Sequence, residues 1–259
     1  MLAAALALTL SVAHADMGLA PLRHVLSPEN PKVEFIVSNP SDRIMDARVS
    51  WVDLAATETG YKDAAPDLRE KLSAAPWLVV SPADFRLKPG ARQVVTVRLK
   101  NGKSPPKGER RSHLLIETEA SRTPIRKAST GLQVDVGLGM SAPVILRNGG
   151  KADAEISEVR LLRDDDGLLL LETSIEPSGP WSSFGRMVVT YTPEGGEKEL
   201  LGVRENVAGY TDAQNRRVTM PLGFVSLGAG ELTVRYEGAA EFEGDVFDQR
   251  SFDVAPPPQ

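Results

Sequence analysis

The sequence contains no cysteine, which excludes disulfide bonds, thiolate metal ligands and cysteine nucleophiles. It contains only three histidines and no HExxH motif, so a catalytic zinc site is disfavoured. No glycine-rich phosphate loop follows a strand-like run and opens a helix, and no nucleophile elbow supports a catalytic triad. We therefore expect a protein that is not an enzyme, with no catalytic residues, no metal site and no cofactor.

Aromatic residues are also scarce, at 5%, and charge is unevenly spread. Residues 1–150 carry 20 basic and 15 acidic side chains, a net charge of +5, whereas residues 151–259 carry 10 basic and 20 acidic, a net charge of −10. The basic half lacks the interleaved aromatics and basic helical stripes of nucleic-acid-binding proteins, so we expect no nucleic-acid partner. The charge split over 259 residues suggests two domains with different partners.

Long apolar runs are missing, and the one short run lies at the start. Leu2 to Val12 is apolar and is followed by Ala13-His14-Ala15, an A-x-A cleavage signature, although the usual positive charge before the run is absent. The run is too short to span a bilayer, so we interpret residues 1–15 as a Sec signal peptide and expect no membrane insertion. The alternative is a buried N-terminal helix. A secreted chain without cysteine fits the periplasm better than an animal extracellular space.

Strand-like runs alternate with turn signals along the whole chain, and only residues 66–75 look helical. The predicted strands cover residues 33–38, 48–53, 77–80, 93–99, 113–118, 132–140 and 144–147, then 155–163, 167–175, 186–192, 198–203, 215–220, 230–236 and 246–254. Short strands with frequent turns indicate an all-β fold of two β-sandwiches. A glycine-containing boundary at residues 148–151 gives domains 16–148 and 151–255, followed by a Pro-rich tail at 256–259.

Two local features have structural interpretations. Asp164-Asp165-Asp166-Gly167 places three acids together, but their spacing lacks the ligand pattern of a calcium-binding EF-hand, so we interpret them as a hairpin turn. Residues 174–184 contain two prolines and a glycine and are predicted to form a loop.

The stretch 132–140 is the most informative part of the sequence. Its large apolar residues occupy every second position and would form one face of a β-strand; we call them the apolar row, and they are Leu132, Val134, Val136, Leu138 and Met140. The other face is poor, because three of its positions between 131 and 139 are glycine. Such a strand stabilises itself weakly, so its apolar row either packs into its own domain or is offered to a partner.

Residues 19–147 resemble the periplasmic pilus-assembly chaperones of bacterial chaperone–usher systems. The segments that carry the resemblance, in order, are Arg23-His24-Val25-Leu26, residues 37–39, 49–53, 80–82, 85–91 and 108–112, and the strand at 132–140. The resemblance implies two immunoglobulin-like β-sandwich domains in a boomerang arrangement. The second domain matches the family poorly, and its assignment rests on its strand count.

The resemblance also implies a mechanism. Pilus subunits of these systems lack a final strand, and the chaperone lends them its own by donor-strand complementation before passing them to an outer-membrane usher. The apolar row would fill the subunit's groove, which makes pilus or surface-fibre subunits and the usher the expected partners. Whether the client-free chaperone caps itself as a dimer stays open.

Two charged positions are implied by the same resemblance. The family grips the subunit's terminal carboxylate with two basic residues, and Arg23 matches the first, whereas Ser141 stands near the place of the second, a lysine. Either Arg23 anchors alone, or Arg147, Arg126 or Lys127 substitutes, or the client is not a standard pilin. Many relatives carry a glutamate at the position of Arg111, which here either pairs with an acid of the second domain or leaves the interdomain angle to be set differently.

The competing interpretation is a structural or adhesive two-domain immunoglobulin-like protein without chaperone activity. The apolar row distinguishes the two, since a chaperone leaves it available and an adhesin buries it or receives a strand from elsewhere.

Overall fold

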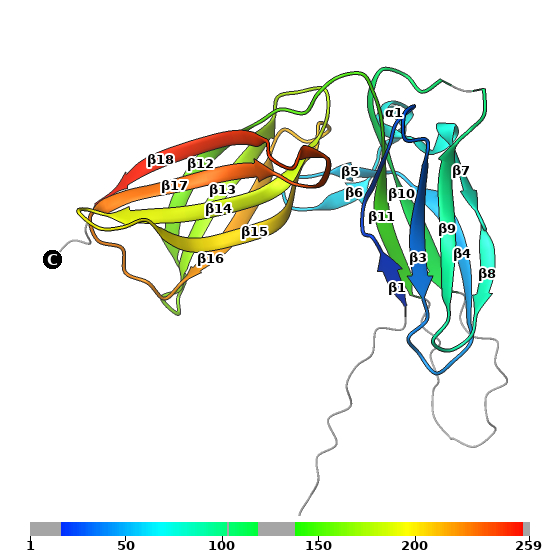
Figure 1. Cartoon of the computed structure of the whole chain (residues 1–259), viewed down its shortest axis with the longest axis horizontal. Coiled ribbons are helices and arrows are strands. Elements are labelled where there is room, and N and C mark those ends of the chain that lie inside the picture. Colours follow the sequence, from blue (N-terminus) through cyan, green and yellow to red (C-terminus); the bar gives the residue numbers. More distant parts are fainter. Residues whose placement is uncertain (1–16, 103, 119–137, 256–259) are drawn as a thin grey trace, which may run out of the picture. The chain divides into compact units, whose positions relative to one another are not determined.

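The computed structural model describes residues 17–102, 104–118 and 138–255 (Figure 1). The predicted signal peptide at 1–15, three members of the apolar row (Leu132, Val134 and Val136) and the tail at 256–259 lie outside the described residues. No helix in the described ranges is long and apolar enough to cross a membrane.

The described residues confirm the all-β prediction. Beside eighteen strands they contain one α-helix, α1 (Pro66–Leu72), and two 3₁₀ turns, η1 (Ala75–Trp77) and η2 (Ala240–Phe242). They form two compact units. The first unit consists of the described residues within 1–52, 74–103 and 112–145. The second unit consists of the described residues within 53–73, 104–111 and 146–259. Segments 53–73 and 104–111 thus group with the second unit, and the predicted boundary near residue 150 stays a prediction.

The first half of the chain builds two sheets. One has the order β1 (Gly18–Ala20), β3 (Lys32–Ser38), β9 (Arg92–Leu99) and β7 (Leu78–Ser81). The other has the order β2 (His24–Leu26), β11 (Gly139–Asn148), β10 (Gly108–Thr118), β4 (Met45–Val52) and β8 (Asp84–Leu87). A separate hairpin consists of β5 (Leu54–Ala56) and β6 (Tyr61–Asp63).

Alternating side chains give these sheets one buried face each. On β3, Val33, Phe35 and Val37 are buried while the residues between them face solvent, and Phe35 pairs directly with the buried Val95 of β9. Leu114 on β10 contributes from the second sheet. Period-two alternation therefore places one core between the two sheets.

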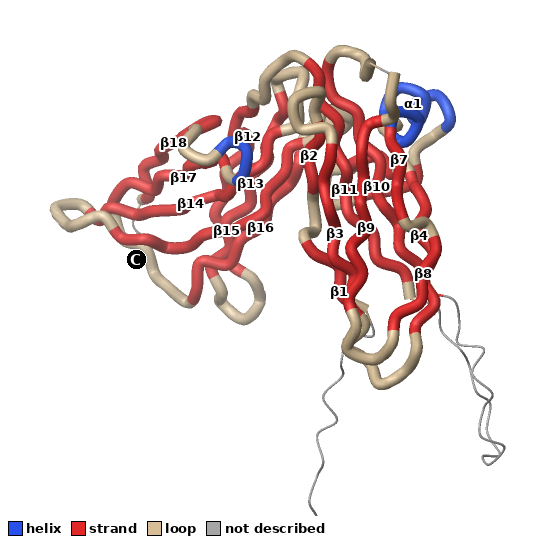
Figure 2. The backbone as a smooth tube through the Cα atoms, turned by 45° about the vertical axis from the view of Figure 1, so that its right-hand side comes forward, coloured by secondary structure: helices blue, strands red, loops and turns tan. Residues whose placement is uncertain are grey.

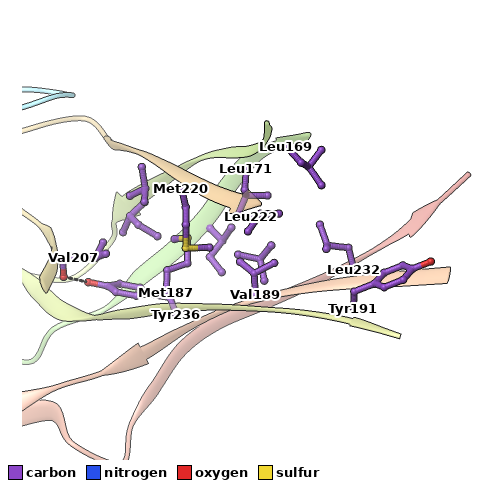
Figure 3. Close-up of a cluster of buried hydrophobic side chains, with 14 of the residues drawn as sticks. Leu169, Leu171, Met187, Val189, Tyr191, Val207, Met220, Leu222, Leu232 and Tyr236 are labelled. Carbon is purple, nitrogen blue, oxygen red and sulfur yellow. Dashed lines mark hydrogen bonds between the residues drawn. The ribbon is translucent and has the colours of Figure 1, made fainter. Parts of the chain in front are cut away.

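The second unit contains a sandwich of two sheets. One has the order β12 (Ala154–Arg163), β13 (Leu169–Pro177) and β16 (Arg216–Gly223). The other has the order β15 (Glu199–Gly209), β14 (Ser183–Pro193), β17 (Gly230–Gly238) and β18 (Val246–Val254). Figure 3 shows its core, in which Leu171, Met187 and Tyr236 are fully buried. The Tyr236 hydroxyl lies 3.0 Å from the carbonyl oxygen of Val207 and donates to it, which satisfies the only polar group of that side chain.

In the second unit the predicted strands agree with the observed ones to within three residues at each end, except that β15 reaches Gly209 instead of ending at residue 203. The loop predicted at 174–184 is partly wrong, because Ser174 and Ile175 are buried within β13, which reaches Pro177. The three-acid turn is confirmed: the amides of Asp166 and Leu168 both donate to the Asp164 carboxylate.

Candidate functional site

Strand β11 has two unequal neighbours. β10 covers one edge along its length, whereas the other edge is paired only with β2, which has three residues against ten in β11. Figure 2 shows β2 toward the upper end of the unit, and the His24 ring there lies 2.8 Å from the Glu34 carbonyl oxygen of β3. Within the described part of the chain, most of the outer edge of β11 therefore has no strand beside it.

The start of β11 is fixed against the end of β10. The Thr118 amide donates to the Leu138 carbonyl oxygen at 2.8 Å, and the Leu138 amide donates to the Thr118 hydroxyl at 3.0 Å. Since successive residues of a strand direct their N–H groups to opposite edges, the amides of Gly139 and Ser141 point away from β10. They point toward the edge that β2 leaves largely uncovered.

The apolar face of β11 changes from buried to exposed along the strand. Leu146, Val144 and Ala142 are almost fully buried, Met140 is half-buried, and 38% of Leu138 is exposed. The strand therefore anchors in its own core at one end and leaves that core at the other. Met140 is therefore the residue at which the apolar face passes from the protein's own core to the surface that a partner could cover.

Arg23 lies immediately before β2, the strand that neighbours β11, and is half-buried. The next residue, His24, packs edge-on against Phe35 with ring centroids 4.7 Å apart, which holds the backbone at this point. Ser141 lies exposed on β11 and carries no charge. Arg126 and Lys127, two of the predicted substitutes for a lysine there, lie outside the described residues.

Arg147 is engaged inside the second unit. The residue is 2% exposed, and its guanidinium donates to Glu109 at 2.8 Å, to Glu241 at 2.6 Å and to the Ser182 carbonyl oxygen at 2.8 Å. Glu109 also accepts from the Ser182 amide and hydroxyl. With its donors directed at these acceptors, Arg147 is not exposed to bind a second carboxylate from a client.

Arg111 is likewise buried inside the second unit and pairs with Asp212 at 2.9 Å. It also donates to the Leu54 carbonyl oxygen at 3.0 Å and lies 4.0 Å from the centroid of the Tyr210 ring. Asp212 in turn accepts from the Ala56 amide at 2.7 Å, so one carboxylate joins Arg111 to the β5–β6 hairpin. The acid that the sequence left unidentified is Asp212.

Tyr61 completes this cluster from β6. Its ring is partly exposed, yet desolvation raises the pKa of its hydroxyl, and the neighbouring Tyr210 raises it further. We call the set of Arg111, Asp212, Tyr61 and Tyr210 the Arg111 cluster.

Sequence reasoning identified both arginines but missed their acidic partners, Glu109, Glu241 and Asp212. Glu109 belongs to a motif that the sequence did single out, residues 108–112, and its charge inside a strand was the available signal. Asp212 lies in the turn between β15 and β16, 101 residues from Arg111, and nothing in its local sequence marks it. Among the described residues, no group of three or more histidines or acids is placed to hold a metal ion.

No protein-family model matches this chain. No curated protein matches it either.

Solved structures of bacterial chaperones are similar to it. The E. coli chaperone DraB is 17% identical, with 93% of this chain and 96% of that chain covered, at a TM-score of 0.42. The Pseudomonas aeruginosa CupB2 chaperone is 14% identical, with coverage of 92% and 100% and a TM-score of 0.43. The Salmonella enterica SafA pilin in complex with the SafB chaperone gives 13% identity, coverage of 94% and 99%, and a TM-score of 0.46. At these identities and TM-scores, the function proposed below rests on the chain's own residues.

Proposed function

We propose that this protein is a periplasmic chaperone that binds and stabilises pilus or surface-fibre subunits by donor-strand complementation and delivers them to an outer-membrane usher. The observation that carries the proposal is the start of β11, where an edge that no described strand covers coincides with the exposed end of the apolar row. An unpaired edge offers backbone donors and acceptors to an added strand, and the row supplies side chains for its groove.

Burial of the apolar row in a client's groove would favour binding. Each large apolar side chain contributes roughly 1.5–3 kcal/mol when it is fully buried. Leu138 and Met140 already lie outside the protein's own core to different degrees, and Leu132, Val134 and Val136 extend the same alternation in the sequence. Backbone hydrogen bonds add affinity that does not depend on the client's sequence, whereas the side chains select the register.

Arg23 is proposed to anchor the client's terminal carboxylate. It precedes the short strand that flanks the uncovered edge, and a guanidinium can bind a carboxylate through two parallel hydrogen bonds. Arg147 is committed to Glu109 and Glu241, and Ser141 has no charge, so we propose that Arg23 serves without either of them.

The remaining parts of the proposal concern export, the second partner, the oligomeric state and catalysis. We propose export through the signal peptide at 1–15, an outer-membrane usher as the second partner, and self-capping of the same edge in a client-free dimer. We propose that the protein has no catalytic activity.

The proposal is tested by capture of clients in cells. The tagged protein is co-expressed with the genes that neighbour its own, and the material bound is compared for wild type, Val134→Asp and the matched control Gln133→Asp, which adds the same charge to the opposite face of the strand predicted at 132–140. We expect wild type and Gln133→Asp to recover a small β-rich subunit and Val134→Asp to recover none. Unfolding of free Val134→Asp would instead show that the row is ordinary core.

A further inference from the structure

The last residue of β10 makes an unusual connection to the first described residue before β11. In a hydrogen-bonded pair of an antiparallel ladder, the two opposed residues exchange two main-chain hydrogen bonds. Here the Thr118 amide donates to the Leu138 carbonyl oxygen at 2.8 Å, but the Leu138 amide donates to the Thr118 hydroxyl, at 3.0 Å. The hydroxyl also lies 3.2 Å from the Leu138 carbonyl oxygen and can donate to it.

The strand needs such a connection because its own side chains fix its register poorly at this point. Gly139 has no side chain, and Ser141 is small and exposed. Tight packing begins only at Ala142. Strands that are rich in glycine on one face are prone to slip, and a slip by one residue moves every side chain to the other face. At the start of β11 such a slip would exchange Leu138 and Met140 for Gly139 and Ser141.

We infer that Thr118 is a positioning residue: its hydroxyl fixes the register of β11 where the apolar row leaves the protein's own core, and so decides which side chains are presented. The register is a property of the free protein, whereas its consequence for clients rests on the function proposed above. The two are tested separately.

The first test is hydrogen exchange in the free protein. Thr118→Val keeps the shape of the side chain and removes the hydroxyl, whereas Thr118→Ser keeps the hydroxyl and loses only a methyl group. We expect the Leu138 amide to exchange about fivefold faster in Thr118→Val, in line with the loss of one hydrogen bond, and at nearly the wild-type rate in Thr118→Ser. Equal rates in all three proteins would overturn the inference.

The second test reads the register directly and uses the absence of cysteine from the chain. A Cβ atom at position 139 would lie 3.8 Å from Cγ of Glu117, so these two residues are neighbours across the strands. In the Glu117→Cys, Gly139→Cys background we expect a disulfide to form in high yield, and in lower yield when Thr118→Val is added. An unchanged yield would contradict a role of the hydroxyl in register.

The third test concerns clients and uses the co-expression experiment described above. We expect Thr118→Val to capture less subunit than wild type and Thr118→Ser to capture as much. Equal capture by all three would show that the register does not matter to clients. An empty wild-type lane would contradict the chaperone proposal and with it the effect on clients, while exchange and disulfide yield still decide whether Thr118 sets the register.

Discussion

Reversing the charge of Arg111 is expected to be among the most damaging single substitutions in the second unit. Arg111 is 1% exposed and donates to Oδ2 of Asp212 and to the Leu54 carbonyl oxygen. Removing one partner of a buried ion pair costs about 3–5 kcal/mol, because the other charge stays buried without compensation. Arg111→Met should therefore destabilise by that amount, and Arg111→Glu by more, because it places a second carboxylate beside Asp212.

The assay is thermal and urea unfolding of the mature protein. For chains of this size each kcal/mol lowers Tm by about 2–4 °C, so Arg111→Met should lower Tm by about 6–20 °C. Arg92→Met is the matched control, since Arg92 is exposed on β9, and substitutions of that kind usually change stability by less than about 0.5 kcal/mol.

A double variant tests the reasoning more strictly. In Arg111→Met with Asp212→Asn, neither residue of the pair leaves a buried charge, and the asparagine oxygen can still accept from the Ala56 amide. We expect the double variant to recover at least half of the stability lost in Arg111→Met. Additive losses, or a Tm for Arg111→Met equal to that of wild type, would refute the claim that the pair is energetically coupled.

Three further predictions follow from single contacts. Arg23→Ala should lower the amount of captured client with little change in Tm, and an unchanged yield would show that carboxylate anchoring does not operate at this residue. The hydrogen bonds from Arg86 lower the pKa of the Asp46 carboxyl group. The pair therefore stabilises the fold fully at pH values above the ordinary carboxyl pKa, and this stabilisation is lost as the pH falls through the lowered pKa of Asp46. An NMR titration should therefore find the Asp46 pKa nearer its ordinary value in Arg86→Gln. Tyr236→Phe removes a hydroxyl that is hydrogen-bonded in the core and should lower the free energy of unfolding by about 1–2 kcal/mol, measured in urea; no loss would contradict that bond's contribution.

The strands of the second unit were predictable because their sequence alternates over eight or more residues between clear turn signals. β14 is an example: Met187, Val189 and Tyr191 alternate with more exposed residues and are all buried. Five strands of three or four residues, β1, β2, β5, β6 and β8, were not predicted, because so few residues show no periodicity; β7, also of four residues, was predicted from its apolar run. Their pairing is decided by neighbours distant in the sequence.

The candidate site was predictable only in part for a similar reason. Alternation identified the apolar row, but whether a residue is covered depends on how far β2 extends beside β11, which no local pattern records. The same holds for Arg147. The sequence shows only a charged residue at the end of a predicted strand, whereas the ion pairs of Arg147 with Glu109 and Glu241 follow from the tertiary fold. The role of Thr118 became visible only with the position of Leu138.

The central claim, that a client strand pairs with the outer edge of β11, is tested most directly by hydrogen exchange of β11 in the free and client-bound protein. The Leu138 amide is bonded to Thr118 and should be protected in both states. The amides of Gly139 and Ser141 point to the other edge and should exchange rapidly in the client-free monomer, measured at a concentration too low for a self-capped dimer to form, but become protected when the client binds. Rapid exchange of both amides in a stable complex would contradict strand lending at this edge.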